Sequence, residues 1–196
     1  MKKMKKIIFL FVLFPLFLYV YSCSPPQILV GSGGSAMVVA EGDRSLGTVV
    51  DDASIKINIA AKFLNNGDGL FVDINVTVLE GRILLTGLVD SQEVRIDAVR
   101  LVWEVEGVRE VINEIQVGNR DTLKEYANDL WINTQAKALA TKTIGFRAIA
   151  YNFETIKGKV YIAGITSRPE QLDAVIEVVK NIKGVKEIVN YVILVK

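Results

Sequence analysis

The sequence contains no histidine and only one cysteine among its 196 residues. Without histidine the chain has no Ser-His-Asp triad and no imidazole ligand for a metal ion. The lone cysteine, Cys23, has no partner for a disulfide bond within the chain. Carboxylates fall mainly on the polar positions of predicted strands and helices, which is typical of a solvated surface. We therefore expect neither an enzyme nor a metal or other cofactor.

The first 22 residues have the pattern of an export signal. The chain begins with a basic head, which precedes an almost continuous apolar run from Ile7 to Tyr21. A basic head, an apolar segment of about 15 residues and a small residue before the cut are typical of secretory signal peptides. A membrane-spanning helix needs about 20 apolar residues. We therefore predict a cleaved signal peptide over residues 1–22.

Cys23 lies at the predicted cut. Val20-Tyr21-Ser22-Cys23 resembles the lipobox of bacterial lipoproteins, although Tyr21 is bulkier than usual. The resemblance implies that Cys23 carries acyl chains, such as palmitate, and that Ser24 directs the protein to the outer membrane. The alternative is an incidental cysteine in an ordinary signal peptide. Residues 23–43 include a Gly/Ser-rich stretch with few charges, and we predict a flexible tether there.

The rest of the chain is one small unit duplicated. The 68 residues from Asp51 to Gly118 recur without a gap at Asn128 to Val195, with a constant offset of 77. Gly-Arg-Ile-Leu-Leu-Thr-Gly in the first copy, for example, matches Gly-Lys-Val-Tyr-Ile-Ala-Gly in the second. A repeat of this length is a duplicated domain rather than a solenoid unit. Each copy can therefore serve as a control for the other.

Each copy reads as helix, strand, strand, helix, strand. Ile55, Ile59 and Phe63 have helical spacing, with Asp51 or Asp52 as the expected cap. Apolar and polar residues alternate over 72–78, as in a strand, and Glu80-Gly81 has the form of a tight hairpin turn. Asp90-Ser91-Gln92-Glu93 and Ser167-Arg168-Pro169-Glu170 have the form of capping boxes that open the second helices.

This order of elements resembles the BON domain. The glycine-flanked strand and the ending Gly-Val-x-x-Val/Ile-x-Asn support the resemblance in both copies. Together with the lipobox, they resemble the dual BON-domain outer-membrane lipoproteins of Gram-negative bacteria. The resemblance implies an α+β fold of two tandem BON domains, each αββαβ with two helices on a three-stranded mixed sheet. The expected boundaries are 44–118 and 128–196, with a linker over 119–127.

The two copies differ in charge. Residues 51–118 hold 6 Lys/Arg and 12 Asp/Glu, a net charge of −6, whereas residues 128–195 hold 9 and 6, a net charge of +3. A positive balance on the second domain favours attraction to an anionic lipid surface. Ordinary charge drift between duplicated domains is the alternative. No basic stripe with interleaved aromatics appears, so we expect no nucleic acid partner.

Trp131 is the sharpest single candidate for membrane contact. At 100° per residue it lies about 100° from the predicted core stripe of its helix, whereas its counterpart in the first copy is Ser54. An amphipathic ring near a helix start suits a lipid headgroup boundary. The alternative is that Trp131 covers the junction between the domains. The predicted membrane-binding residues are Leu130, Trp131, Gln135, Ala138 and Lys142.

A rival surface lies on the second sheet. Its predicted interdomain or partner residues are Tyr161, Val189, Tyr191 and Ile193. An apolar patch of this size normally marks an interface. We expect the first domain to dock there, with a protein partner as the alternative.

The resemblance implies binding to phospholipid and maintenance of the outer-membrane barrier, with no catalytic residues. We therefore expect a lipid-anchored protein on the periplasmic face of the outer membrane. Its second domain would bind an anionic phospholipid membrane, and no small-molecule substrate is expected. The alternative function is a non-catalytic scaffold that binds proteins of envelope and outer-membrane assembly.

Overall fold

The computed structural model describes residues 45–66, 73–118 and 123–195. The predicted signal peptide, Cys23 and the tether lie outside the described residues. Within the described ranges, no helix is both long enough and apolar enough to cross a bilayer.

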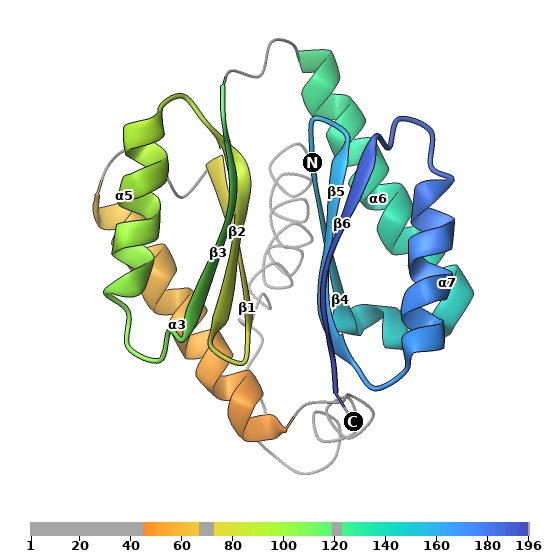
Figure 1. Cartoon of the computed structure of the whole chain (residues 1–196), viewed down its shortest axis with the longest axis horizontal. Helices are drawn as coiled ribbons and strands as arrows, with labels where there is room; N and C mark the ends of the chain where they lie inside the picture. Colours follow the sequence, from red (N-terminus) through yellow and green to blue (C-terminus); the bar gives the residue numbers. More distant parts are fainter. Residues whose placement is uncertain (1–44, 67–72, 119–122, 196) are drawn as a thin grey trace, which may run out of the picture. The chain divides into compact units, whose positions relative to one another are not determined.

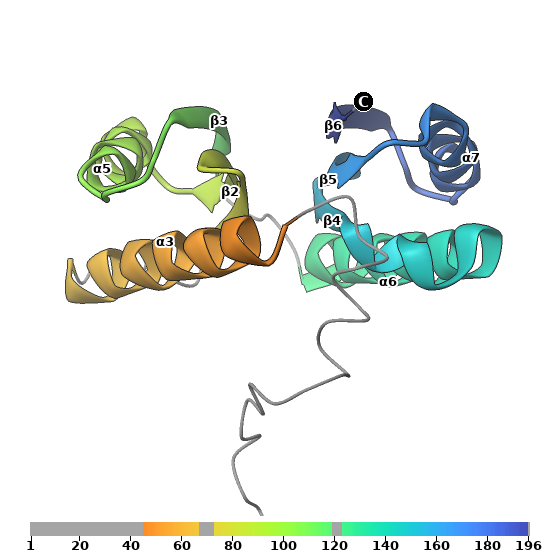
Figure 2. The same cartoon turned by 90° about the horizontal axis from the view of Figure 1, so that it is seen from below.

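The first domain follows the predicted order of elements. It consists of α3 (Leu46–Asn65), β1 (Ile74–Leu79), β2 (Arg82–Val89), α5 (Gln92–Trp103) and β3 (Glu110–Val117). Strand β2 lies in the centre of the sheet, antiparallel to β1 and parallel to β3. The sheet is therefore mixed, and both helices cover the same face of it (Figures 1 and 2).

The second domain repeats this arrangement and adds one element. It consists of α6 (Leu123–Ile144), the 3-10 helix η1 (Gly145–Ala150), β4 (Tyr151–Ile156), β5 (Lys159–Thr166), α7 (Pro169–Lys180) and β6 (Glu187–Leu194). Strand β5 is central, antiparallel to β4 and parallel to β6. Two α+β domains, each with two α-helices on a three-stranded mixed sheet, confirm the predicted fold class.

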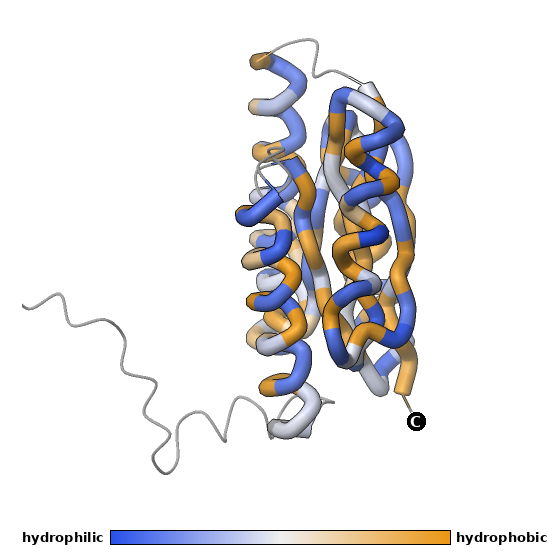
Figure 3. Tube along the Cα trace, turned by 90° about the vertical axis from the view of Figure 1, so that its left-hand side faces the viewer, coloured by the Kyte–Doolittle hydropathy of each residue, from blue (hydrophilic) through white to orange (hydrophobic). Residues whose placement is uncertain are grey.

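Apolar periodicity builds each core. In α3, Ile55, Ile59 and Phe63 face the sheet and are almost fully buried. The equivalent stripe in α6 has smaller side chains, and its residues Ile132 and Ala136 are completely buried. Hydrophobic and hydrophilic segments alternate along the elements (Figure 3). Each domain therefore has its own hydrophobic core, which sets the outward faces of the helices.

A close approach of two backbone segments explains why the repeated strand motif has glycine at the same position in both domains. A Cβ atom on Gly164 in β5 would lie 2.3 Å from the carbonyl oxygen of Ala150. The equivalent atom on Gly87 in β2 would lie 2.2 Å from the carbonyl oxygen of Asp73. Only glycine lets the two backbones approach this closely, so the motif marks the point where the first strand of each domain begins.

The predicted helix caps were partly wrong. Helix α3 begins at Leu46 and is capped by Ser45, whose hydroxyl accepts a hydrogen bond from the amide of Thr48 at 3.2 Å. Asp52 is instead buried inside the helix, and its carboxylate accepts hydrogen bonds from the hairpin amides of Glu80 and Gly81 at 2.7 and 2.9 Å. The acidic residue thus joins two distant segments rather than capping its own helix.

The second helices also begin differently from the predicted capping boxes. Ser91, not Asp90, caps α5 by accepting a hydrogen bond from the amide of Val94 at 3.3 Å. Helix α7 has Arg168 at its N-cap with no capping side-chain hydrogen bond, and its first residue is Pro169. Proline supplies no amide hydrogen and has a preset φ, so it can open a helix without such a cap.

Helix α6 begins at Leu123, inside the range 119–127 that we expect from the sequence to be a linker. The helix is therefore longer at its N-terminus than the repeated segment, which starts at Asn128. This extra turn brings Lys124 and Tyr126 onto the same helix as Trp131.

Candidate membrane-facing site

Helix α6 exposes several large apolar and aromatic side chains to solvent. Its buried residues are Asp129, Ile132, Ala136 and Ala140. The exposed large apolar and aromatic side chains of the helix are Leu123 at 86%, Tyr126 at 47%, Leu130 at 56% and Trp131 at 46%. Leu123 and Leu130 are seven residues apart, so they lie within about 20° of each other around the helix. We call Leu123, Tyr126, Leu130 and Trp131 the α6 apolar face.

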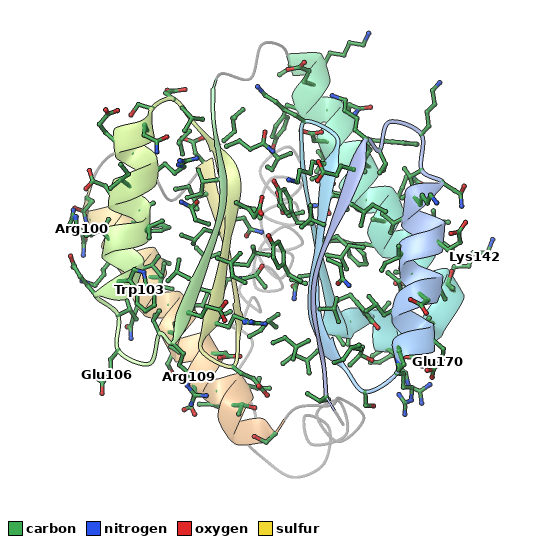
Figure 4. All side chains as sticks on the ribbon, in the orientation of Figure 1. Arg100, Trp103, Glu106, Arg109, Lys142 and Glu170 are labelled. Atoms are coloured by element: carbon green, nitrogen blue, oxygen red, sulfur yellow. The ribbon has the colours of Figure 1, made fainter. Side chains whose placement is uncertain are left out.

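The five predicted membrane-binding residues all lie on α6, and four of them are exposed to solvent. Leu130, Trp131, Ala138 and Lys142 are exposed, and Gln135 is half-buried. Lys142 is labelled in Figure 4 and lies at the outer edge of its domain. An indole beside apolar and basic side chains has the composition of a membrane–water boundary.

An apolar extension at the far end of α6 was missed from the sequence. In η1, Phe146 and Ile149 are 72% and 69% exposed. They border a cavity of about 330 Å³, lined mainly by apolar side chains that include Tyr151 and Phe153. The signal for this feature was the run Ile144-Gly145-Phe146, where Gly145 has a φ of 67° and ends the helix.

The first domain has a different outward stripe. Val50, Ile57 and Leu64 recur every seven residues on α3 and are 62%, 67% and 59% exposed. Sequence reasoning missed this stripe, although the seven-residue spacing carries the signal. It contains no aromatic residue, and Ser54 at the position of Trp131 donates a hydrogen bond to the carbonyl of Val50. The tryptophan at this helix position is thus present only in the second domain.

The predicted interdomain residues lie among side chains of both domains. Tyr161 is buried in a cluster with Leu88 of β2, which Val189 and Tyr191 join at its edge. Ile193 packs at the edge of a second cluster that contains Leu79 and Leu84 of the first domain with Ala163 and Ile165 of the second. Apolar contact between the two sheets therefore involves all four predicted residues.

Polar contacts reinforce this face. The Tyr191 hydroxyl donates a hydrogen bond to the carboxylate of Glu114, and the Tyr161 hydroxyl accepts one from the Gln116 amide at 3.3 Å. The Lys159 ammonium lies 3.6 Å from Glu114. Burial, together with the bond to Glu114, raises the pKa of Tyr191 well above its usual value. Burial and the bond to Glu114 therefore both favour the protonated form of the Tyr191 hydroxyl.

Several acidic side chains of the described residues take part in structural contacts. Across residues 45–66, 73–118 and 123–195, no group of three or more histidine, cysteine or acidic side chains has the arrangement of a metal site. Acidic side chains accept hydrogen bonds from backbone amides, as Asp129 does from Gly158, or from side chains, as Glu154 does from Asn75, and others form ion pairs, as Glu104 does with Lys62 at 2.8 Å. The candidate site on α6 therefore presents exposed apolar side chains and lysines.

Comparison with known proteins identifies the duplicated unit. The family model of the BON domain matches residues 51–119 and 128–196. An uncharacterized protein of Anaplasma centrale is 42% identical over 144 residues, covering 73% of this chain and 94% of that protein. A 21 kDa hemolysin of Actinobacillus pleuropneumoniae is 31% identical, covering 76% and 78%.

A third relative carries a descriptive name. The outer membrane lipoprotein DolP of Haemophilus influenzae is 28% identical over 167 residues, covering 82% of this chain and 83% of that protein. The family match spans both copies of the repeat and most of the described structure. This chain therefore belongs to the BON-domain family, with two BON domains in tandem.

Proposed function

We propose that this protein is a non-catalytic component of the bacterial cell envelope that binds anionic phospholipid membranes through its second BON domain. The observation that carries the proposal is the α6 apolar face, where Leu130 and Trp131 remain exposed beside a domain of net positive charge. Removing such side chains from water favours insertion by roughly 1.5–3 kcal/mol for each fully buried large residue. Nearby lysines add about 1 kcal/mol each at an anionic surface.

The proposal includes a lipid anchor and a location. Cys23 would carry acyl chains and hold the protein on the periplasmic face of the outer membrane. Support comes from the lipobox-like sequence before Cys23 and from the similarity to a relative that is named an outer membrane lipoprotein. Acyl attachment would keep the two domains close to the bilayer, so a weak contact through α6 would suffice to orient them.

A second candidate function is a scaffold that binds envelope proteins. One observation favours it: on α5 of the first domain, Ile96 and Trp103 are 58% and 52% exposed and seven residues apart. Trp103 lies at the C-terminal end of α5 (Figure 4). Exposed tryptophan is enriched at the energetic centres of protein interfaces. In this reading the acyl chains alone would supply membrane attachment.

Vesicle flotation distinguishes the two functions. The chain from Ser24 to Lys196, which lacks the acylation site, should float with vesicles that contain anionic phospholipid and should sediment with neutral ones. Trp131→Ala should weaken flotation about tenfold, as expected for loss of one large inserted side chain. Ser54→Ala, the matched change in the first domain, should leave flotation unchanged. Absence of flotation for the unmodified chain would favour the scaffold, whereas equal flotation of all three proteins would place the membrane contact away from Trp131.

A further inference from the structure

A small basic depression lies beside the N-terminal half of α6. It has a volume of about 350 Å³ and is lined by Lys124, Glu125, Asn128, Asp129, Lys157 and Lys186. The three lysines come from three separate segments: the first turn of α6, the turn between β4 and β5, and the segment that leads into β6. We call this depression the lysine pocket.

The backbone of the lysine pocket is held in place. The Asp129 carboxylate accepts hydrogen bonds from the amides of Lys157 and Gly158 at 2.7 and 2.9 Å. The side-chain stem of Lys186 crosses the same turn, because its Cγ and Cδ atoms would lie 3.2 Å from a Cβ atom on Gly158. The Asp129 carboxylate thus fixes the turn through backbone amides rather than through the lysine side chains.

The three lysines, Lys124, Lys157 and Lys186, form no ion pair with a carboxylate of the described residues. The lining holds three lysines against two acidic residues, Glu125 and Asp129, so its formal charge is +1, and a net positive lining attracts an anion. The geometry therefore fits an anionic ligand.

The first domain supplies an internal control. Its equivalent depression, of about 480 Å³, is lined by four carboxylates and one guanidinium, and Glu106 and Arg109 of this set are labelled in Figure 4. The hairpin turn is fixed in the same way, because Asp52 accepts a hydrogen bond from the amide of Gly81 as Asp129 does from Gly158. Yet Asn128 replaces Asp51, and Lys157 replaces Glu80. The fold forms with either sign of charge, so folding does not require the lysines.

The lysine pocket opens beside the proposed membrane residue. Lys124 precedes Trp131 by seven residues, which places them about 20° apart around α6 and about 10 Å apart along its axis. Asn128, on the pocket lining, lies between them on the helix. A surface that receives the Trp131 ring can therefore present its headgroups to the lysines.

We propose that the lysine pocket binds a phosphate group, with preference for a phosphomonoester. Lysine binds phosphate as a point charge, and a monoester carries about −1.5 to −2 charges at pH 7 with three open oxygens, compared with one charge on a phosphodiester. The group can come from a membrane lipid with a terminal phosphate or from a free phosphomonoester. The lipid source rests on the function proposed above; the free source does not.

The first experiment uses soluble phosphate. Glycerol 3-phosphate, added at constant ionic strength to the 15N-labelled chain from Ser24 to Lys196, should shift the amide signals of Lys157, Gly158 and Lys186. The equivalent signals of Glu80, Gly81 and Arg109 should stay in place. Sodium chloride at matched ionic strength should shift neither set. These measurements need no variant, so they test the pocket in the native chain.

The second experiment uses vesicles and matched variants. Vesicles that contain phosphatidic acid should bind the chain more tightly than phosphatidylglycerol vesicles of equal surface potential. Lys157→Gln with Lys186→Gln should remove this preference and weaken binding to phosphatidic acid about thirtyfold, as expected for two lysines at an anionic surface. Lys137→Gln with Lys142→Gln removes the same charge from α6 outside the lysine pocket, and it should weaken both vesicle types alike and keep the preference.

The outcomes separate the sources and the two proposals. A response to both probes indicates a general phosphomonoester site, and a response to phosphatidic acid vesicles alone indicates a lipid headgroup site. A response to glycerol 3-phosphate without vesicle binding would keep the pocket and contradict the membrane function. Trp131-dependent flotation with no pocket shifts and no effect of the Lys157 and Lys186 changes would overturn the phosphate site and leave the membrane function standing.

Discussion

The carboxylate of Asp129 accepts a hydrogen bond from the backbone amide of Lys157 at 2.7 Å, and Asp52 makes the same bond to Glu80 at the same distance in the first domain. In each domain this bond joins the first helix to the tip of the β-hairpin. Both aspartates are buried, with 6% of each residue exposed. The paired bonds therefore fix the helix against the sheet at the end where the lysine pocket opens.

Asp129→Ala should lower the free energy of unfolding by about 2–4 kcal/mol, because it leaves the amides of Lys157 and Gly158 without their acceptor. Urea unfolding followed by circular dichroism measures the loss. Asp173→Ala, an exposed position on α7, should change stability by less than about 0.5 kcal/mol. Equal effects of the two changes would show that the buried hydrogen bonds do not secure the hairpin.

Gly164→Ala should destabilise the second domain by about 1–3 kcal/mol, because its Cβ would meet the carbonyl oxygen of Ala150 at 2.3 Å and the strands must move apart. Gly47→Ala is the matched change on α3, where the nearest atom, the Ser45 hydroxyl oxygen, would be 3.9 Å away. That variant should be neutral or up to about 1 kcal/mol more stable. Thermal melting compares them, and an undiminished melting temperature for Gly164→Ala would contradict the close approach.

Tyr191 should make the fold sensitive to alkaline pH. Because its pKa is raised in the folded state, its contribution is complete below the unfolded value of about 10 and is lost as the pH rises from there toward the folded value. Urea midpoints measured between pH 8 and pH 11 should therefore fall less steeply for Tyr191→Phe. Tyr126→Phe, an exposed position, should follow the unmodified chain. Parallel curves for all three proteins would rule out this coupling.

Acylation tests the proposed anchor. In cells labelled with a radioactive fatty acid, the unmodified protein should carry the label, and Cys23→Ser should carry none and keep its signal peptide. The reason is chemical, since the thiol is the acyl acceptor and serine lacks it. Label on the serine variant, or none on the unmodified protein, would leave the two domains without a lipid anchor.

The sequence predicted most of the fold because the duplication repeats its signals. The offset of 77 brings two hairpin turns and two glycine-flanked strands into register, and both copies have the predicted αββαβ order. The helix starts were less predictable. Asp52 has the chemistry of an N-cap, but its carboxylate binds amides 28 and 29 residues away, and such a contact leaves no local pattern.

The candidate site was predicted in part. Helical periodicity placed Trp131 off the core stripe, and its side chain is 46% exposed. Phe146 and Ile149 were not predicted, because their exposure depends on η1, which replaces a further turn of α6. The lysine pocket could not be seen from spacing alone either, since Lys124, Lys157 and Lys186 are far apart in the chain and meet only through the fold.

The fluorescence of Trp131 tests most directly whether this side chain enters the headgroup boundary of the membrane. Trp103 is first replaced by phenylalanine, so that Trp131 is the only tryptophan in the chain from Ser24 to Lys196. Because the indole is now partly exposed to water, vesicles of anionic phospholipid should shift its emission to the blue, and added salt should reverse the shift as surface charges are screened. Neutral vesicles should produce no shift. An emission maximum that stays constant while the protein floats with anionic vesicles would contradict the claim.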